Sequence, residues 1–457
     1  MPIDFLLERW AEDPGRDSLV WRDRVFDYRW LLERIDYLGS ELEAQQVPAQ
    51  AVVLLEGDYS PNSLALLLAL VRHRCVVVPL TAEQSRNRRD ECLTVVEAEY
   101  GLRVSEDDEV EFRAFGRHAA HPLYKRLRSK GHPALVLFSS GSTGPSKAAV
   151  HDFERLLQKY RARRRDLRTL TFLGYDHIGG VDTLLYSLSN ASCIVTVPDR
   201  SPDTVCTAVQ DHSVEVLPVS PSFLNLLILS QAYEHYDLSS LKVITYGAEV
   251  MPQSTLRRCH ELFPWVQLLQ KFGATEVGTL RSKSRAPDST WVMIGGEGFQ
   301  TRVVDGILQI KAQSAILGYL NAPDPFTDDG WFITGDLVEV DGDYIRILGR
   351  ESDVITVGGE KVNPAAVEDV IQELPAVREV AVFGEPNALL GSMVCARASL
   401  VESSDAEAGR AAIREIKRHC RQRLRPHEVP IKITIGEENL YTDRFKKVRR
   451  SGPEDAG

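Results

Sequence analysis

The chain has 457 residues, of which 43% are hydrophobic and 26% are charged. That length exceeds what one hydrophobic core normally serves, so we expect two or more domains, and the composition is that of a folded protein. The 54 Lys and Arg are outnumbered by 65 Asp and Glu, a formal net charge of -11. This excess of acid argues against a broad basic surface for nucleic acid, so we expect no nucleic-acid partner.

The N-terminal sequence MPIDFLLERWAEDPG carries acids among its apolar residues and does not have the pattern of a secretory signal. The longest apolar run, residues 63–71, ends at Arg72 and is too short to cross a bilayer. The seven cysteines are an odd number without CxxC spacing, which is typical of reduced thiols in a core. We therefore expect a cytoplasmic protein without a membrane span.

Apolar runs alternate with segments of helical period over the first 263 residues. Strands are predicted at residues 52–56, 75–79, 135–139, 193–197, 214–219 and 241–246. Helices are predicted between them at residues 61–73, 203–211, 222–231 and 252–263. Continuous Val, Ile and Leu strands separated by helices favour parallel sheets covered on both faces, which is an α/β architecture.

The pattern changes twice in the remaining chain. After about residue 278, short strands at 306–310, 319–320, 331–334 and 344–348 predict an antiparallel, β-barrel-like subdomain. A helix at 364–372, strands at 377–383 and 393–400, and a helix at 406–424 then predict a small α+β unit. We expect a large N-terminal domain of two α/β subdomains and the β subdomain, residues 1–350, followed by a small domain, residues 351–457.

Residues 135–150, LVLFSSGSTGPSKAAV, form the most informative segment. A predicted strand runs into a stretch made only of Ser, Thr and Gly, and a lysine follows. Backbone N–H groups, hydroxyls and an ammonium suit a polyphosphate, although Ala148 after the lysine excludes a Walker A loop. A flexible linker fits less well, because a strand precedes the segment and an apolar run follows. The candidate phosphate-binding residues are Ser139, Ser140, Gly141, Ser142, Thr143, Gly144 and Lys147.

The motif SSGSTGPSK closely resembles the phosphate loop of the adenylate-forming superfamily, which includes acyl- and aryl-CoA synthetases, adenylation domains of nonribosomal peptide synthetases, and luciferases. Further segments are similar to that family in the same order: GYDHIGG at 174–180, VLPVSPSFL at 216–224, QKFGATE at 270–276, WFITGDL at 331–337, GRESDVI at 349–355 and TDRFKKVRR at 442–450. The resemblance covers roughly residues 135–450.

The resemblance implies how the chain binds ATP. Gly247, Ala248, Glu249, Phe272, Gly273, Ala274 and Thr275 would border the adenine and phosphate, with the Phe272 ring against the base. Asp336 would accept the ribose hydroxyls, Arg350 would reach the ribose or phosphate, and Glu276 would hold Mg²⁺.

The acyl pocket implied by the family is formed by Tyr175, His177, Ile178, Ser220, Tyr246, Gly247 and Gly273. Relatives that activate amino acids carry an acidic residue just after the aromatic-His position, where this chain has Ile178. An amino-acid substrate is therefore disfavoured, although Asp176 and Asp182 keep it open. We expect a small aryl or medium acyl acid.

The C-terminal segment departs from the family at three positions. Leu440 stands where the family usually has a proline shortly before the threonine of the closing motif. Lys446 stands at the place of the adenylation lysine, but Phe445 replaces the usual glycine before it, and Lys447 is a rival. Ser352 stands at the hinge, where the family usually has Asp or Lys. Gly358 and Gly359 would lie along an incoming pantetheine thiol.

The chemistry that this resemblance implies is adenylation followed by thioester formation. The acid attacks the α-phosphorus of MgATP and pyrophosphate leaves, with Lys446, His177, Thr143 and Lys147 as catalytic residues. The acyl group then passes to coenzyme A or, alternatively, to the phosphopantetheine arm of a carrier protein. Two other classes of function remain open. One is a degenerate relative that binds a nucleotide or acyl ligand without turnover, and the other is a kinase-like phosphoryl transferase.

Overall fold

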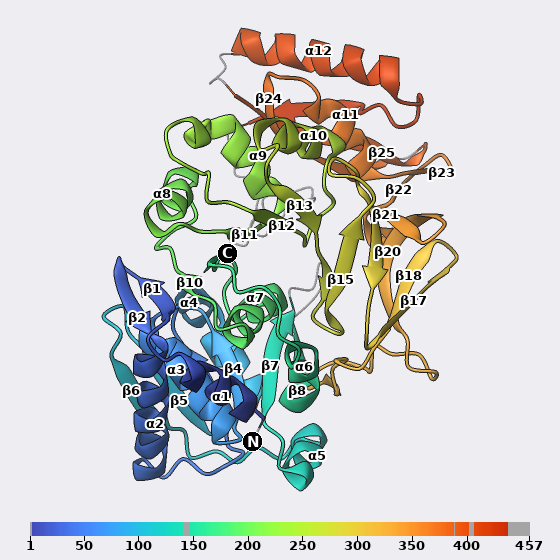
Figure 1. Ribbon diagram of the computed structural model, residues 1–457. Helices are drawn as coiled ribbons and strands as arrows, with labels where there is room; N and C mark the ends of the chain where they lie inside the picture. The colour runs from blue at the N-terminus through green and yellow to red at the C-terminus, as the bar shows by residue number, and fades with distance from the viewer. Residues whose placement is uncertain (1, 140–145, 388, 402–405, 437–457) are drawn as a thin grey trace.

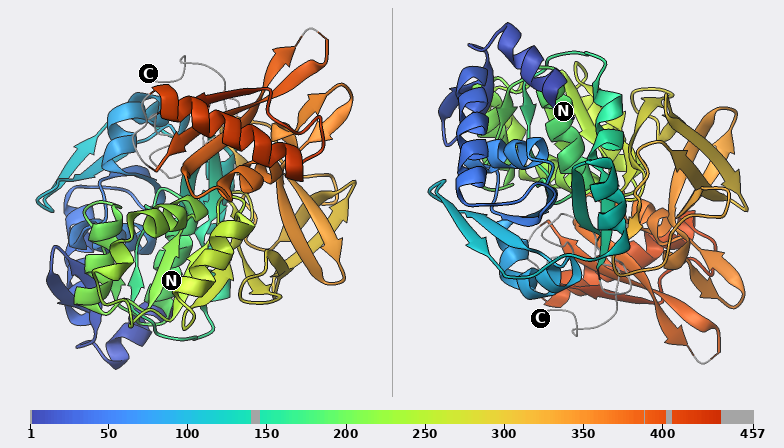
Figure 2. Two further views of the ribbon diagram at one scale, coloured as in Figure 1. Left: turned by 90° about the horizontal axis from the view of Figure 1, so that it is seen from above. Right: turned by 90° about the horizontal axis from the view of Figure 1, so that it is seen from below.

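The computed structural model describes residues 2–139, 146–387, 389–401 and 406–436. Within these residues the strands form three seven-stranded sheets and one five-stranded sheet. Figure 1 shows the N-terminal sheet below, a second α/β subdomain in the middle, an antiparallel sheet at one side and the small C-terminal domain on top. Seen along the perpendicular directions of Figure 2, the small domain lies across one end of the large one.

The N-terminal sheet has the strand order β19-β8-β7-β4-β3-β5-β6. Its strands are β3 (Val52–Glu56), β4 (Val76–Leu80), β5 (Tyr100–Val104), β6 (Val110–Ala114), β7 (Ala134–Ser139), β8 (Lys147–Asp152) and β19 (Gly318–Tyr319). Strands β3 and β4 are fully buried and parallel, as their continuous Val and Leu runs predict. Residues on both of their faces belong to apolar clusters, so the sheet is covered on both sides.

The helices of this subdomain are α1 (Asp4–Glu12), α2 (Tyr28–Ala44), α3 (Pro61–Arg72), α4 (Ala82–Val95), α5 (Pro122–Lys130) and α6 (Phe153–Leu157), with the 3₁₀ turn η1 (Gln158–Tyr160). Helix α3 starts where predicted because Ser60 and Ser63 form a reciprocal capping box and Pro61 occupies the first turn.

The second α/β subdomain has the strand order β13-β12-β11-β9-β10-β1-β2. Its strands are β1 (Asp17–Trp21), β2 (Arg24–Asp27), β9 (Thr169–Leu170), β10 (Ile194–Val195), β11 (Val216–Val219), β12 (Val243–Tyr246) and β13 (Gln267–Gln270). Its helices are α7 (Ile178–Ser189), α8 (Pro202–His212), α9 (Pro221–Ser230), η2 (Ala232–Glu234) and α10 (Gln253–Leu262). Strands β11, β12 and β13 are parallel neighbours, so their carboxyl ends lie at one edge.

The third sheet is antiparallel throughout, in the order β14-β15-β16-β21-β20-β18-β17. It comprises β14 (Phe272–Ala274), β15 (Gly278–Ser284), β16 (Trp291–Gly295), β17 (Phe299–Val304), β18 (Ile307–Ala312), β20 (Phe332–Asp341) and β21 (Tyr344–Arg350). The antiparallel subdomain predicted from the spacing of turns is therefore confirmed.

The small domain follows the 3₁₀ turn η3 (Glu351–Asp353). It contains β22 (Ile355–Val357), β23 (Glu360–Val362), α11 (Pro364–Gln372), β24 (Val377–Asn387), β25 (Gly391–Leu400), α12 (Ala406–Arg423) and β26 (Lys432–Ile435). Residues from its sheet, α11 and α12 form a separate apolar cluster.

Two strands pair differently from the sequence-based expectation. Strand β8 returns antiparallel to β7, so the candidate phosphate segment joins the two strands of a hairpin. Strand β19, which we assigned to the antiparallel subdomain, pairs with β8 in the N-terminal sheet instead. A two-residue strand carries too little local pattern to reveal its partner, and this pairing brings residue 319 to the hairpin.

Candidate active site

The two ends of the candidate phosphate segment, Ser139 and residues 146–147, are hydrogen-bonded into the N-terminal sheet. Ser139, at the end of β7, pairs with Lys147 at the start of β8. The Asn321 side chain donates to the Ser146 carbonyl at 2.9 Å and accepts from the Ala148 N–H at 2.9 Å. The predicted residues Ser140, Gly141, Ser142, Thr143 and Gly144 lie outside the described residues.

Tyr319 connects the predicted phosphate lysine with the predicted metal ligand. The Lys147 ammonium lies 5.4 Å from the centroid of the Tyr319 ring, and the Tyr319 hydroxyl donates to the Glu276 carboxylate. Burial and the neighbouring Glu276 carboxylate raise the pKa of Tyr319, so its hydroxyl stays protonated as a donor. The structure thus brings Lys147 and Glu276, which are far apart in sequence, to one aromatic ring. Sequence reasoning missed Tyr319 because its strand was assigned to another sheet.

Glu276 offers a single carboxylate for a metal. Within the described ranges, His, Cys, Asp and Glu side chains do not gather in groups of three or more that would hold an ion by themselves. A lone carboxylate fits Mg²⁺ bound together with a nucleotide, because Mg²⁺ keeps several waters and takes phosphate oxygens from the substrate.

The predicted adenine and acyl-pocket residues follow the carboxyl ends of three parallel strands. Ser220 follows β11, Tyr246 ends β12 and precedes Gly247, and Phe272 comes two residues after the end of β13. A side chain at Gly247 would place its Cβ 2.6 Å from the Lys271 carbonyl oxygen, so glycine is needed there. In open α/β sheets this edge is where ligands bind.

Several of these residues also have structural contacts. Ser220 caps helix α9 through the Phe223 N–H at 3.1 Å, and Glu249 accepts from the Ser222 N–H at 3.2 Å. Tyr246 and Phe272 are buried, while Gly273 is exposed and Ala274 and Thr275 are partly exposed. Ala248 has a φ of +70°, so the turn after β12 is strained for a residue other than glycine.

Residues 175–178 lead into helix α7, which packs against β14 and β15. Tyr175 is buried and its hydroxyl donates to the Gly57 carbonyl, while Ile178 is 5% exposed within the N-terminal apolar cluster. His177 is partly exposed and caps α7, with its Nδ1 accepting from the Gly179 N–H at 3.0 Å. His177 is therefore the member of this segment most open to a ligand.

Asp336 and Arg350 face each other across strands β20 and β21. The Arg350 Nε lies 2.8 Å from an Asp336 carboxylate oxygen, and Arg350 also donates to the Thr334 carbonyl at 2.6 Å. Gly335 between Thr334 and Asp336 has a φ of +72°, which favours glycine. The structure thus brings together the two residues predicted to contact the ribose.

The predicted hinge and thiol residues lie at the start of the small domain. Ser352 is exposed in η3, and Gly358 and Gly359, with φ of +58° and +92°, form the turn between β22 and β23. The Gly358 N–H donates to the Leu390 carbonyl at 2.8 Å. Lys446 and Lys447 lie outside the described residues.

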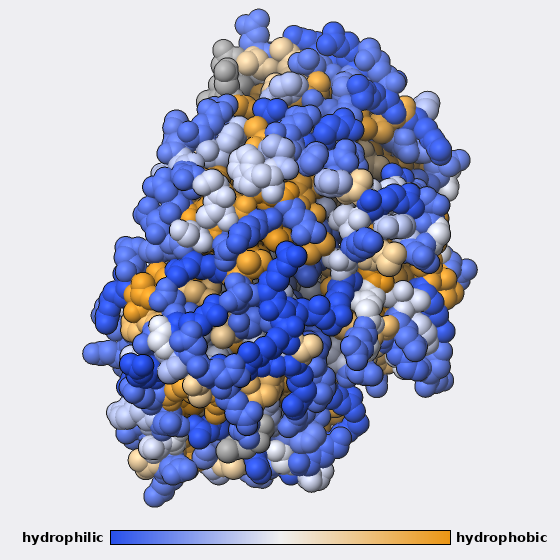
Figure 3. All heavy atoms as spheres, viewed as in Figure 1, coloured by the Kyte–Doolittle hydropathy of each residue, from blue (hydrophilic) through white to orange (hydrophobic). Residues whose placement is uncertain are grey.

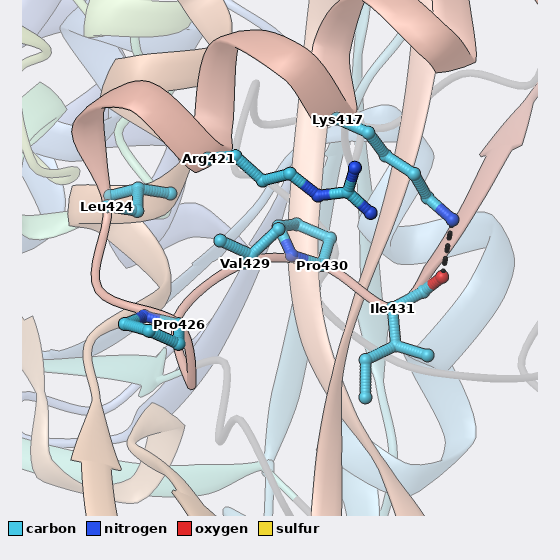
Figure 4. A pocket seen from close by; sticks show the side chains of 7 residues that line it. All are labelled: Lys417, Arg421, Leu424, Pro426, Val429, Pro430 and Ile431. Atoms are coloured by element: carbon cyan, nitrogen blue, oxygen red, sulfur yellow. Dashed lines mark hydrogen bonds between the residues drawn. The ribbon is translucent and has the colours of Figure 1, made fainter.

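The surface is mostly hydrophilic on one face and carries a hollow on the small domain. The face in Figure 3 is mostly hydrophilic, with apolar side chains gathered in smaller areas. A hollow on the small domain, between α12 and the segment before β26, is lined by Lys417, Arg421, Leu424, Pro426, Val429, Pro430 and Ile431 (Figure 4), none of which is a predicted site residue. Among the helices of the described chain, none is long and apolar enough to cross a membrane.

Comparison with known proteins identifies the family. Residues 6–305 match the model of the AMP-binding enzyme family, and residues 366–446 match the AMP-binding enzyme C-terminal domain. The chain belongs to the AMP-binding enzyme family. The segment between the two matches, residues 306–365, contains Asp336, Arg350 and the predicted hinge residue Ser352.

Curated relatives of this AMP-binding enzyme are CoA ligases. The chain is 25% identical over 448 residues to the indoleacetate–CoA ligase of Aromatoleum aromaticum, covering 87% of this chain and 88% of that protein. It is 24% identical over 459 residues to the 2-succinylbenzoate–CoA ligase of Listeria monocytogenes, covering 95% of each. The prediction of an AMP-forming acid–thiol ligase is thus confirmed at the level of the family and its relatives.

Solved structures show the same fold. The anthranilate CoA ligase AuaEII in complex with anthranoyl-AMP has a TM-score of 0.82 at 19% identity, covering 98% of this chain and 95% of that chain. The o-succinylbenzoate CoA synthetase from Bacillus subtilis with its acyl-adenylate intermediate has a TM-score of 0.78 at 20% identity, covering 97% and 96%. The predicted superfamily and fold class are confirmed.

Proposed function

We propose that this AMP-binding enzyme activates a small aryl or medium acyl carboxylic acid with ATP and transfers the acyl group to the thiol of coenzyme A. The observation that carries the proposal is the meeting of Lys147 and Glu276 at the ring of Tyr319. A cation after a hydroxyl-rich segment and a carboxylate at the same ring suit a magnesium-bound polyphosphate. The relatives named above, which are ligases of aryl and acyl acids, support the choice of acid and of acceptor.

In the first half-reaction a carboxylate oxygen of the acid attacks the α-phosphorus of ATP. The bond from that phosphorus to the bridging oxygen breaks, and pyrophosphate leaves with the electron pair. Lys147 pairs with phosphate charge, and Asp336 accepts the ribose hydroxyls beside Arg350, so that the nucleotide is held for in-line attack. Glu276 would hold Mg²⁺ together with the phosphates, and the bound ion would supply charge neutralisation. Tyr319 keeps the Glu276 carboxylate oriented through its hydroxyl.

In the second half-reaction the thiol sulfur attacks the acyl carbonyl carbon, the bond from that carbon to the phosphate oxygen breaks, AMP leaves with the electron pair, and the thiol proton is released to solvent. We assign residues 1–350 to the large domain and 351–457 to a small domain that turns about Ser352 between the two steps. The turn at Gly358 and Gly359 leaves no side chain in the way of a pantetheine arm. The free, buried cysteines in the structure support a cytoplasmic, reducing setting.

The test is a panel of carboxylic acids assayed for ATP–pyrophosphate exchange and, with CoA present, for release of AMP and formation of an acyl-CoA. We expect at least one aryl or medium acyl acid to give both signals. Exchange followed by transfer only to a phosphopantetheinylated carrier protein would contradict the acceptor. Release of ADP, or no exchange with any acid, would contradict the proposal as a whole.

A matched pair of variants tests the assignment of the adenylation lysine. Lys446→Ala abolishes exchange if Lys446 contacts the reacting phosphate, while Lys447→Ala retains it. Thioester formation from supplied acyl adenylate stays nearly intact in Lys446→Ala. The reverse result would move the role to Lys447.

A further inference from the structure

A group of charged side chains lies where helix α7 packs on strands β14 and β15, next to the proposed acyl pocket. Asp182 stands on α7 one turn beyond Ile178, so the two share a face of the helix. Lys159 comes from η1, and Lys271 stands between β13 and β14. None of the three takes part in the reaction proposed above.

The Asp182 carboxylate is fully partnered. It forms an ion pair with the Lys159 ammonium and accepts from the Tyr160 hydroxyl at 2.6 Å. Burial opposes ionisation of Asp182, but the Lys159 and Lys271 ammonium groups outweigh it, so the pKa of this carboxyl lies below its ordinary value. Lys159 is satisfied as well, because it also donates to the Thr279 carbonyl at 3.0 Å.

The Lys271 ammonium differs from these two groups in its contacts. Among the residues that the structure describes, the Lys271 ammonium makes no direct hydrogen bond or ion pair, although Lys271 is partly buried. Burial lowers the pKa of Lys271. The Asp182 carboxylate opposes this effect, whereas the positive charges of Lys159, Arg281 and Arg164 add to it. The group therefore holds two ammonium groups against one carboxylate. An excess positive charge in a partly buried place is costly unless an anion joins it.

Lys271 belongs to the backbone framework of the proposed acyl pocket. Its N–H donates to the Tyr246 carbonyl at 2.7 Å, and its own carbonyl takes the space that a side chain at Gly247 would fill. Gly273 follows two residues later. Three residues of the proposed acyl pocket, Tyr246, Gly247 and Gly273, thus adjoin Lys271, and a fourth, Ile178, is one helical turn from Asp182.

We propose that the acid activated by this enzyme carries a second anionic group, remote from the carboxyl that reacts, and that Lys271 pairs with this group. The inference rests on the proposed function, since it names the class of acid that the same site takes. A cationic substituent would face Asp182, whose partners are already present. A second carboxylate is the simplest anion of this kind, and its pairing with an ammonium is a charge-assisted hydrogen bond.

The test compares dicarboxylic acids with their half-amides, which keep the shape and remove the remote charge. Benzene-1,4-dicarboxylate is paired with 4-carbamoylbenzoate, and glutarate with its half-amide, in ATP–pyrophosphate exchange. The wild-type enzyme is expected to prefer the diacid in kcat/KM by tenfold or more in at least one pair. In Lys271→Met the preference is lost, because kcat/KM falls for the diacid and not for the half-amide.

Two further variants serve as controls. Lys283→Met removes an exposed lysine on strand β15, which packs against α7, and is expected to keep the diacid preference. Lys271→Arg keeps the positive charge and is expected to retain part of the preference for the diacid. If Lys271→Met does not fold, as judged by circular dichroism, Lys271→Gln takes its place.

The outcomes separate this inference from the proposed function. Exchange with half-amides or monoacids at least as good as with diacids, or a diacid preference that survives Lys271→Met, overturns the inference and leaves the ligase standing. Preference for acids that carry an ammonium group overturns it as well. Failure of every acid overturns both.

Discussion

Many residues of the proposed site have a structural contact before any ligand binds. His177 caps α7, Ser220 caps α9, Glu249 accepts from the start of α9, and Asp336 pairs with Arg350. These contacts fix rotamers in advance, which lowers the entropy that a ligand must remove. They also mean that a variant must be tested for folding and for binding separately.

Asp336→Asn separates the two roles at one residue. Asn keeps the size of the side chain but replaces one carboxylate oxygen, which would accept a hydrogen bond from a ribose hydroxyl, with an amide nitrogen. A hydrogen bond to a charged group contributes roughly 1.5–3 kcal/mol, so we expect the KM for ATP to rise tenfold or more. The free energy of unfolding falls by less than about 1 kcal/mol, because Arg350 is 53% exposed. Glu339→Gln, which breaks the Glu339–Arg346 pair on the same two strands, leaves the KM unchanged. An unchanged KM in Asp336→Asn would remove this residue from the nucleotide site.

Among the described residues, hydrogen bonds between polar groups join the two domains. Asp369 on α11 accepts from the Ser254 hydroxyl at 3.2 Å, at the beginning of α10, whose N-cap Pro252 has no side chain for capping. The Asn225 side chain on α9 donates to the Arg378 carbonyl at 2.9 Å. Such a contact resembles a transient interface and is compatible with rotation of the small domain.

The short element η3 is where such a rotation is expected. Ser352→Pro fixes φ and restricts Glu351 before it, so we expect thioester formation from acyl adenylate to slow by tenfold or more while ATP–pyrophosphate exchange changes little. Single-turnover measurement of each half-reaction checks this. Ser352→Ala, which leaves the backbone free, is the control and keeps both rates. Equal slowing of both half-reactions in the proline variant would argue against a hinge at this position.

Sequence patterns predicted the bounds of helices and strands better than they predicted which strands pair with each other. The buried runs of β3 and β4 and the capped helices α3 and α11 fall within a residue of expectation, because burial and capping are local signals. Helix α7 was not predicted, because Gly179 and Gly180 in its first turn weaken the helical pattern. A Cβ at Gly180 would lie 2.0 Å from the Gly174 carbonyl oxygen, so packing dictates glycine there. The antiparallel return of β8, the pairing of β19 and the group around Lys271 depend on contacts between distant residues, which no local pattern carries.

One buried imidazole is expected to make the stability of the molecule depend on pH. His151 on β8 is 1% exposed, and neither ring nitrogen has a hydrogen-bond partner in the described structure. Burial lowers the pKa of His151 from 6.5 to about 4. The folded state therefore favours the neutral ring, and this contribution to stability is complete above pH 6.5 and is lost as the pH falls toward 4.

Urea unfolding at pH 7.5 and pH 5 tests this. Between pH 7.5 and pH 5, protonation of His151 is expected to lower the free energy of unfolding of the wild-type chain by about 2 kcal/mol. In His151→Leu the fall in the free energy of unfolding over the same pH range is expected to be smaller by about 2 kcal/mol. His235→Gln, at an exposed histidine, behaves as wild type. The same pH-dependent loss in His151→Leu and wild type would show that the imidazole is not the cause.

The burial of the seven cysteines has a consequence for the chemistry as well as for the core. An acyl adenylate reacts readily with thiolates, and the enzyme proposed here makes one while carrying seven sulfurs of its own. Burial raises the pKa of every one of these thiols, to about 12 at Cys75, Cys193, Cys206 and Cys259 and to about 11 at Cys92, Cys395 and Cys420. They stay protonated and buried at neutral pH, so we expect the protein not to acylate its own cysteines and the incoming thiol acceptor to meet no competition from them.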